Sequence, residues 1–160
     1  MERTLDTRYV GDKGSLFALA FNYQKKDKPD AAKKIYIELI RRYPRSVHVP
    51  DTLLNVGEIF FDDGKVEQAL KAYRKVTTNY RDSDVYEYAL YKLGYVYYNL
   101  REYEDSIKSF KQVVELSKGQ DKRKVYFTNQ AYSAMSLAFA EVEDGWKRAR
   151  DYFRGVGGDE

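Results

Sequence analysis

The sequence predicts an all-α fold built from about four stacked antiparallel helix pairs. The first observation behind this prediction is that five side-chain positions recur at a spacing of 37 residues over three copies. The second is that the chain has only three prolines and no alternating apolar and polar run of the kind that marks a strand. The third is that most of its 16 tyrosines recur at helical spacing.

The clearest recurring position is a small residue with an aromatic residue four positions later. The small residues are Ala32, Ala69 and Ser106, and the aromatic ones are Tyr36, Tyr73 and Phe110. Twelve residues before each small residue lies another small one, preceded by an aliphatic residue and followed three positions later by an aromatic. These earlier small residues are Ala20, Gly57 and Gly94, and their aromatic partners are Tyr23, Phe60 and Tyr97. Such self-similarity at a fixed period is typical of helical repeat proteins.

Close packing between helices explains why small and large residues recur together. Two antiparallel helices can approach closely only where a small side chain on one faces a large side chain on the other. We therefore expect Gly57 and Gly94 each to receive an aromatic ring from the partner helix. Glycine inside a helix costs about 1 kcal/mol relative to alanine, so its use here indicates a packing requirement. One hairpin cannot bury its apolar face alone, whereas stacked hairpins bury it continuously.

The chain divides into a lead-in at residues 1–13, a repeat array at 14–154 and a tail at 155–160. The predicted repeats cover about residues 14–47, 50–83, 87–118 and 124–154. Within them, the helix signals place helices at about 15–26, 29–43, 51–61, 66–80, 84–100, 103–117, 125–141 and 146–154. Ser15 is the expected N-cap of the first helix, and the glycine-rich residues 155–158 are expected to end the last one.

The fourth copy is weaker than the other three. Ala149 and Phe153 fit the small and aromatic pair, but Ala149 follows Ser106 by 43 residues. The six extra residues fit best in the polar stretch at 118–124. No polar capping helix follows the last repeat, although repeat arrays normally have one. The chain is therefore expected to be a fragment of a longer array, or to pack its last face on another surface.

Composition excludes several classes of function. The net charge of +3 comes from 28 basic and 25 acidic residues that are mixed along the chain, which is unlike the basic patch of a nucleic-acid binder. The absence of cysteine excludes a disulfide framework or a thiolate metal site. No apolar run approaches the roughly 20 residues that cross a bilayer. We expect no metal, cofactor, nucleic acid or direct membrane insertion.

These positions resemble those of the tetratricopeptide repeat family. The third repeat matches the family pattern at Leu90, Leu93, Gly94, Tyr97, Ser106, Phe110 and Val113, and the first two repeats match at the equivalent positions. The resemblance implies a right-handed superhelix of helix pairs that binds partners on its concave face. The period of 37 exceeds the family's usual 34 because the linkers between repeats are longer. Such linkers resemble those of bacterial cell-envelope members, of the outer-membrane assembly lipoprotein or Tol-Pal-associated type.

The resemblance implies a partner-binding face on the first helix of each pair. The corresponding residues are Phe17, Phe21, Asn55, Phe61, Tyr88, Tyr91, Lys92, Tyr95, Tyr98 and Asn99. Tyr91, Tyr95 and Tyr98 share a helix face that does not bear Leu93 or Gly94. One interpretation is an aromatic groove, since tyrosine offers contact area and a hydroxyl group. The alternative is that many of these rings pack between helices or lie on the surface.

Other site chemistries have little support in the sequence. Some relatives clamp a terminal carboxylate with five Lys, Arg and Asn residues. Here Asn55 and Lys92 match two of those positions, while Phe17, Phe21 and Tyr88 replace the others, so no clamp is expected. The single histidine, His48, lies in a linker with no second histidine to form a catalytic pair, so no enzymatic activity is expected. Trp146 falls in the column of Tyr103, which predicts core packing.

The sequence therefore favours a non-catalytic scaffold that binds a partner protein or extended peptide on its concave face within a larger multi-protein complex. The alternative is a self-assembly module that packs through its uncapped ends, as a homo-oligomer or against further repeats. Resemblance to the cell-envelope members suggests the periplasm or the outer membrane as the location, and the cytoplasm is the alternative.

Overall fold

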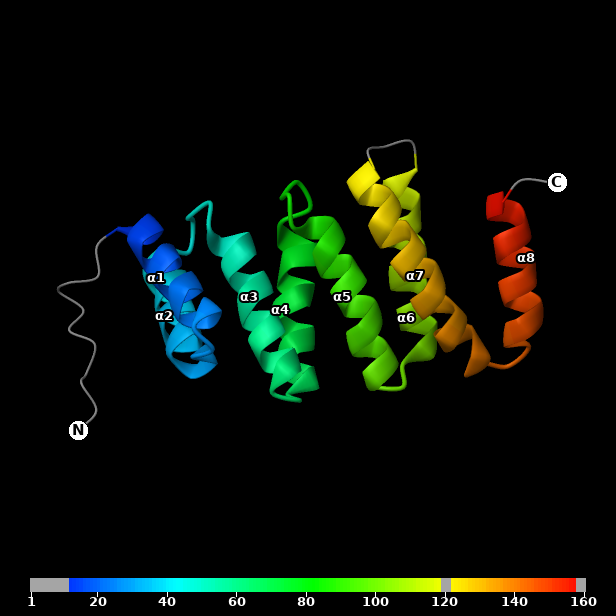
Figure 1. The fold of residues 1–160 in the computed structure, drawn as a ribbon, viewed down its shortest axis with the longest axis horizontal. Coiled ribbons are helices and arrows are strands. Elements are labelled where there is room, and N and C mark those ends of the chain that lie inside the picture. Colours follow the sequence, from blue (N-terminus) through cyan, green and yellow to red (C-terminus); the bar gives the residue numbers. More distant parts are fainter. Residues whose placement is uncertain (1–11, 119–121, 158–160) are drawn as a thin grey trace. The chain divides into compact units, whose positions relative to one another are not determined.

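The computed structural model describes residues 12–118 and 122–157, with only the backbone described at 122–126. Over these residues the chain forms helices and no strand (Figure 1), which confirms the predicted all-α fold. The helices are α1 (Lys13–Lys25), α2 (Pro29–Arg42), α3 (Val49–Asp62), α4 (Val66–Asn79), α5 (Tyr86–Asn99), α6 (Tyr103–Ser117), α7 (Lys122–Ala140) and α8 (Gly145–Gly157). The first helix of each pair is called its A helix, and the second its B helix.

The chain divides into two compact units between Val85 and Tyr86. Unit 1 contains α1 to α4, and unit 2 contains α5 to α8. In unit 1, each A helix packs against its own B helix, and α2 also packs against α3. Its core consists of aliphatic side chains together with the recurring small and aromatic residues, among them Leu16, Ala20, Tyr36, Leu39, Val56, Ala69, Tyr73 and Val76.

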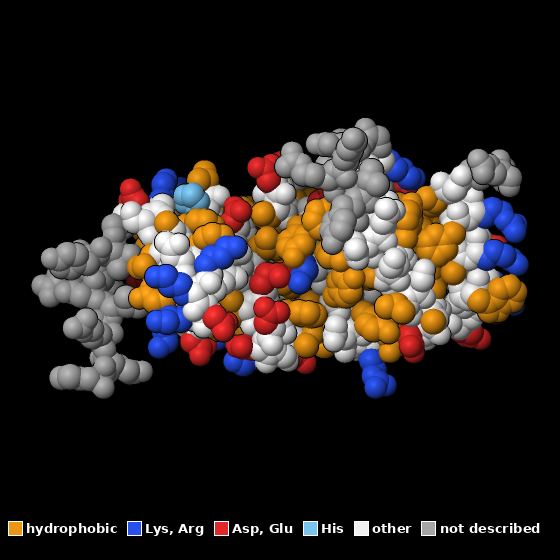
Figure 2. Space-filling view, in the orientation of Figure 1, with side chains coloured by type: hydrophobic (Ala, Val, Ile, Leu, Met, Phe, Trp, Pro, Cys, Tyr) orange, Lys and Arg blue, Asp and Glu red, His pale blue; other side chains and the backbone are white. Residues whose placement is uncertain are grey.

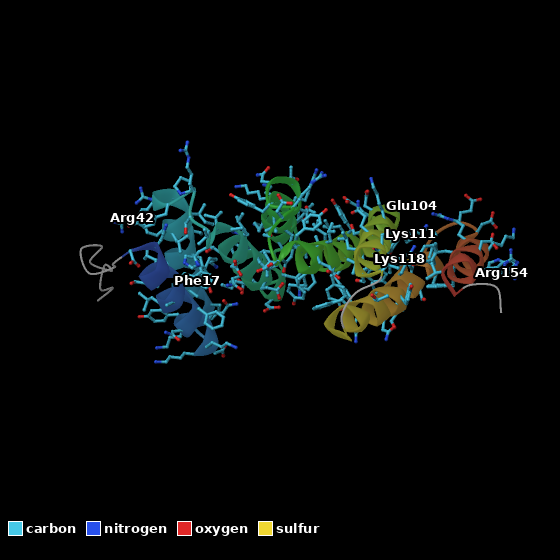
Figure 3. All side chains as sticks on the ribbon, turned by 90° about the horizontal axis from the view of Figure 1, so that it is seen from above. Phe17, Arg42, Glu104, Lys111, Lys118 and Arg154 are labelled. Atoms are coloured by element: carbon cyan, nitrogen blue, oxygen red, sulfur yellow. The ribbon has the colours of Figure 1, made fainter. Side chains whose placement is uncertain are left out.

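In unit 2, α6 packs against both α5 and α7, and the two A helices also touch each other. Its buried core includes Leu90, Ile107, Phe110, Val113, Ala131, Met135 and Phe139. Glu104 and Lys111 on α6 and Lys118 at its C-cap follow one another in Figure 3. Glu104 accepts two hydrogen bonds of 2.6 and 2.7 Å from Arg148 on α8. This ion pair joins the B helices of the unit, in addition to the packing of α8 on α7.

The predicted contact between glycine and an aromatic ring is confirmed in both units. A Cβ atom added to Gly57 would lie 2.6 Å from the Tyr73 ring, and one added to Gly94 would lie 2.5 Å from the Phe110 ring. Both rings are fully buried and cannot easily move away. Ser106, which stands where the other repeats have alanine, donates a 2.8 Å hydrogen bond to the carbonyl oxygen of Gly94. These contacts fix the close approach of α3 to α4 and of α5 to α6.

The same left-handed backbone conformation recurs at the turns between A and B helices. Each of the four turns contains one residue with positive φ, namely Asp27 (55°), Gly64 (72°), Arg101 (62°) and Asp144 (51°). In the first three turns, the backbone amide of the residue after the positive-φ residue donates a hydrogen bond back to the A helix. Its acceptor is the carbonyl oxygen of the recurring aromatic residue that lies three positions after the small residue of that helix. These bonds are Lys28 N to Tyr23 O at 3.0 Å, Lys65 N to Phe60 O at 2.8 Å and Glu102 N to Tyr97 O at 2.9 Å. Such bonds satisfy carbonyls that a helix end leaves without partners.

Three local predictions are wrong. The N-cap of α1 is Asp12, whose Oδ1 accepts hydrogen bonds from the Ser15 amide at 3.0 Å and its hydroxyl at 3.2 Å. Helix α8 continues to Gly157, beyond the predicted end near residue 154, because its last glycines do not interrupt the helix. Trp146 is 66% exposed, with the cations of Lys147 and Arg150 at 5.6 and 5.3 Å from its ring.

The start of the fourth repeat also differs from its prediction. Helix α7 begins at Lys122 rather than near residue 125, so part of the predicted polar insertion is helical. Residues 119–121 of that insertion, the predicted lead-in up to residue 11, and residues 158–160 of the tail lie outside the described residues. None of the helices described here is both long and apolar enough to span a membrane.

Candidate functional site

The A helices of unit 2 carry a continuous set of aromatic side chains. Tyr88, Tyr91, Tyr95 and Tyr98 on α5 are half-buried, and Phe127 on α7 joins them; these five residues are called the tyrosine face. Ring centroids lie 6.0 Å apart for Tyr88 and Tyr91, and 5.1 Å apart for Tyr91 and Tyr95. The Phe127 ring lies 5.6 Å from both Tyr88 and Tyr91. Figure 2 shows hydrophobic side chains gathered over α5 and α7.

The tyrosine face is anchored on the core of unit 2. The rings of Tyr91 and Tyr95 meet the buried ring of Phe110 edge to face, at 6.1 and 5.3 Å. Tyr98 packs in the same manner against Tyr103 at 5.5 Å. The two interpretations of these tyrosines are therefore not exclusive, because each ring packs on a neighbour while part of its surface stays accessible to solvent.

Polar groups border the tyrosine face. The hydroxyl groups of Tyr91 and Tyr95 are 3.2 Å apart and hydrogen-bonded to each other. The Lys92 ammonium lies 5.9 Å from the Tyr88 ring, within range of a cation–π interaction. Asn99 is exposed, and its side-chain amide donates a 2.8 Å hydrogen bond to the Tyr95 carbonyl one turn earlier. The surface thus combines aromatic area with a cation and an amide at its border.

Unit 1 holds the other predicted site residues in a smaller aromatic cluster. Phe17 and Phe21 stack on α1 at 6.4 Å, and Phe17 also stacks on His48 at 5.0 Å. Phe21 is 41% exposed, with the Lys25 ammonium 5.2 Å from its ring. Phe61 is half-buried near the end of α3.

Asn55 belongs to an internal hydrogen-bond network. Its side-chain amide donates to the Tyr36 hydroxyl at 3.0 Å, and that hydroxyl donates to Gln24 at 3.0 Å. Tyr36 is 0% exposed, and burial raises the pKa of its hydroxyl to about 12. The network joins α1, α2 and α3, so Asn55 has a structural role that its sequence position did not predict.

Three residues that contribute to the aromatic clusters of the two units were not predicted from the sequence. Phe127 was missed because the register of the fourth repeat is displaced, so its column could not be matched. Phe110 was assigned only to the core, although its ring also supports Tyr91 and Tyr95. His48, which was expected only to lie in a linker, is the N-cap residue of α3, and its ring stacks on Phe17. Within residues 12–118 and 122–157, no cluster of three His, Asp or Glu could hold a metal ion.

Family comparisons match three segments of the chain. Models described as "Tetratricopeptide repeat" match residues 15–46, 51–83 and 87–119. These segments span nearly all of the first three helix pairs and together cover more than half of the chain. The fourth pair, α7 and α8, lies outside the matched segments, in agreement with its weaker repeat pattern.

Solved structures of low sequence identity share this fold. MamA protein is 20% identical, with a TM-score of 0.66 over 89% of this chain and 70% of MamA. BtubC (BKLC) from P. vanneervenii is 16% identical, with a TM-score of 0.67 over 92% of this chain and 65% of BtubC. A tetratricopeptide repeat protein from Parabacteroides merdae is 17% identical, with a TM-score of 0.60 over 81% of this chain and 52% of its own. None of the curated proteins compared with this chain matches it.

Proposed function

Because this chain belongs to the tetratricopeptide repeat family, whose members present extended binding surfaces, we propose that it is a non-catalytic protein-binding scaffold. Its ligand is a partner protein or extended peptide that lies against the A helices. The tyrosine face of unit 2 is the principal contact surface. This assignment follows the family's general mode of binding, and the narrower resemblance to cell-envelope members stays a prediction.

The observation that carries this proposal is the support of Tyr91 and Tyr95 by Phe110. Rings that are already packed on the core lose little further conformational freedom when a ligand covers them. Tyrosine also combines a large apolar ring with a hydroxyl that can bond to a peptide backbone, which is why it is common in binding surfaces. The tyrosine face therefore has the rigidity and mixed polarity expected of a surface that binds a peptide.

The polar side chains beside the tyrosine face determine which ligands it can bind. The Lys92 ammonium and the exposed Asn99 amide lie on the same helix as the four tyrosines. Lys92 favours an acidic side chain or terminal carboxylate, and Asn99 can bond to backbone groups of an extended segment. Unit 1, taken by itself, offers apolar contacts at the exposed ring of Phe21 and at the half-buried Phe61. Asn55 supports unit 1 through Tyr36 and contributes to binding indirectly.

Affinity capture with matched charge variants tests this proposal. Alanine at Tyr91 or Tyr95 would remove packing on Phe110, so the test variant is Lys92→Glu/Asn99→Asp, which leaves the rings in place. The control is Lys108→Glu/Gln112→Glu on the exposed side of α6, which introduces the same change in charge. Immobilised proteins are incubated with envelope and cytosolic fractions of the source cells. A partner retained by wild type and control but lost from the test variant supports the proposal, and its fraction identifies the compartment.

The opposite result would overturn it. A partner lost only from the α6 variant would place binding on the B helices, and equal retention by all three proteins would exclude the border of the tyrosine face. Circular dichroism of each variant establishes that loss of binding does not reflect unfolding.

Self-assembly is a second candidate, and exposed apolar side chains in the last helix pair favour it. Leu137 on α7 is 57% exposed and Trp146 on α8 is 66% exposed. Sedimentation velocity over a range of concentrations tests this candidate. A mass that rises with concentration in wild type but not in Trp146→Ser supports self-assembly, and a constant monomer mass contradicts it.

A further inference from the structure

The B helices of unit 1 enclose an apolar groove that the proposed function does not use. It lies between α2 and α4, has a volume of about 400 Å³, and has Leu53, Val56 and Phe60 of α3 among its lining residues. Ile37 and Ile40 of α2 form one wall, and Ala72 of α4 lies on the other. Ile37 is 48% exposed, and none of the lining residues belongs to the predicted partner-binding set. The groove is therefore an apolar surface separate from the predicted site.

Basic side chains line this groove, and none of its lining residues carries a carboxylate. Its charged lining residues are Arg41, Lys71 and Lys75. Arg41 is paired with Glu38 on its own helix, at 2.7 and 3.0 Å. Among the residues described, no carboxylate oxygen lies within 4.0 Å of the Lys71 or Lys75 ammonium. The α4 wall thus presents two exposed cations beside an apolar floor.

The basic surface continues along α4. Lys71, Arg74 and Lys75 line a second, shallow hollow of about 390 Å³ together with Thr78 and Asn79. Lys71 and Lys75 are four residues apart, so their side chains leave the helix on one face about one turn apart. A ligand that matches both cations needs carboxylates at a similar spacing, which a helix with acidic residues at i and i+4 provides.

We propose that the groove between α2 and α4 binds an acidic amphipathic helix of a partner protein. The helix inserts its apolar side chains between Ile37 and Ala72, and it places carboxylates opposite Lys71 and Lys75. A volume of about 400 Å³ lies near the lower end of the roughly 300–1,000 Å³ found for binding pockets, which suits a few apolar side chains. The concave shape favours a peptide over a bilayer, because a flat anionic membrane would reach Lys71 and Lys75 but not the floor.

The surface is independent of the tyrosine face, because the two lie on different helices of different units. A scaffold with both surfaces would hold two protein segments at once. Failure of one proposal therefore leaves the other intact, provided that the experiments use variants confined to one unit.

Selection from a peptide library tests the proposal directly. The probes are synthetic helical peptides of about 15 residues, long enough to form helix in part. Each carries apolar residues at i, i+3, i+4 and i+7, and the flanking positions vary among Glu, Gln and Lys. We expect the peptides that bind the immobilised chain to be enriched in Glu at positions one turn apart. Their affinity should fall at least tenfold for Lys71→Glu/Lys75→Glu and should weaken as salt rises.

Two further arms make the test specific. A peptide in which Lys replaces the selected Glu residues should regain affinity for Lys71→Glu/Lys75→Glu, and Ile37→Ser should weaken every selected peptide. Lys25→Glu/Lys26→Glu, at the last residue of α1 and its C-cap, with the same change in charge, should bind as wild type does. The proposal is overturned if selected peptides show no acidic enrichment, if they bind the reversed variant equally well, or if none binds. It is also overturned if the chain binds phosphatidylserine vesicles but no peptide.

Discussion

The side-chain amide of Asn55 on α3 donates a 3.0 Å hydrogen bond to the buried hydroxyl of Tyr36 on α2. The same Tyr36 hydroxyl donates a hydrogen bond to Gln24 on α1. The Tyr36 hydroxyl oxygen therefore joins three helices of unit 1. A buried hydroxyl with both a donor and an acceptor partner is satisfied, so the network stabilises the packing of the two hairpins in this unit.

The first prediction concerns the ionisation of Tyr36. Burial raises the pKa of its hydroxyl to about 12 in the folded chain, above the usual value near 10. The protonated form is thus favoured by folding, and the resulting stability is intact below pH 10 and is lost as pH rises towards 12. Between these limits the free energy of unfolding should fall by at most about 1.4 kcal/mol per pH unit on account of this residue.

Tyr36→Phe provides the comparison. It should destabilise unit 1 at neutral pH by about 1–2 kcal/mol, because Asn55 and Gln24 lose a buried partner. It should also show a smaller loss of stability than wild type between pH 9 and pH 11 in urea unfolding followed by circular dichroism. An equal loss in both proteins would mean that Tyr36 ionises as an exposed tyrosine does.

The second prediction concerns the contacts between glycine and aromatic rings. Gly94→Ala should destabilise unit 2 by about 1–3 kcal/mol, because its Cβ would overlap the buried Phe110 ring. Gly57→Ala should have the same effect in unit 1 through the Tyr73 ring. Both losses should occur despite the gain of about 1 kcal/mol that alanine brings to a helix interior.

Gly155 is the matched control for these substitutions. It lies within α8, and an added Cβ there would have no neighbour within 4 Å. Gly155→Ala should therefore stabilise the chain by roughly 0.5–1 kcal/mol in thermal or urea unfolding. If Gly94→Ala and Gly155→Ala shifted stability in the same direction, the glycine would not be required for helix approach.

The third prediction concerns Tyr152 on α8. Within the described part of the chain, its hydroxyl is buried and has no hydrogen-bond partner, and burial raises its pKa to about 12. Its ring contacts Phe139 and Phe153 and lies 4.7 Å from the Lys111 ammonium. Tyr152→Phe keeps the ring and removes the unsatisfied hydroxyl, so it should leave stability unchanged or raise it by up to about 1 kcal/mol.

Urea unfolding that is followed by Trp146 fluorescence reports on this helix. A loss of more than about 1 kcal/mol in Tyr152→Phe would reveal a hydrogen bond to the Tyr152 hydroxyl in solution. Tyr36→Phe and Tyr152→Phe should therefore change the free energy of unfolding differently. Both hydroxyls are buried, but only that of Tyr36 has hydrogen-bond partners among the described residues.

The helix pairs and their internal contacts were predictable from sequence because steric fit constrains them position by position. Gly57, Gly94, Tyr73 and Phe110 recur with a fixed spacing only if helices approach at those points. Where no neighbouring repeat packs against a helix, the position of a residue in the repeat pattern does not predict whether its side chain is buried. Trp146 occupies a core column but lies on α8, where no further described helix covers its ring.

Side-chain interactions of the candidate site were harder to predict. The positions of Tyr91 and Tyr95 on one face follow from helical spacing alone. Their contacts with Phe127 depend on the placement of α7, which the longer spacing before the fourth repeat conceals. The bond between Asn55 and Tyr36 depends on side-chain reach between two hairpins, which no repeat column encodes. Asp12 and Ser15 are both favourable N-cap residues, so residue type alone does not decide between them.

Site-specific photocrosslinking tests most directly whether the tyrosine face binds a partner. Benzoylphenylalanine is introduced in place of Asn99, at the border of the face on α5, and in a second protein in place of Gln112 on α6. Both positions are exposed, so neither substitution should disturb folding. We expect a crosslinked partner of defined mass from position 99 and none from position 112. A crosslink formed only from position 112 would place the partner on the B helices and show that the tyrosine face is not the binding surface.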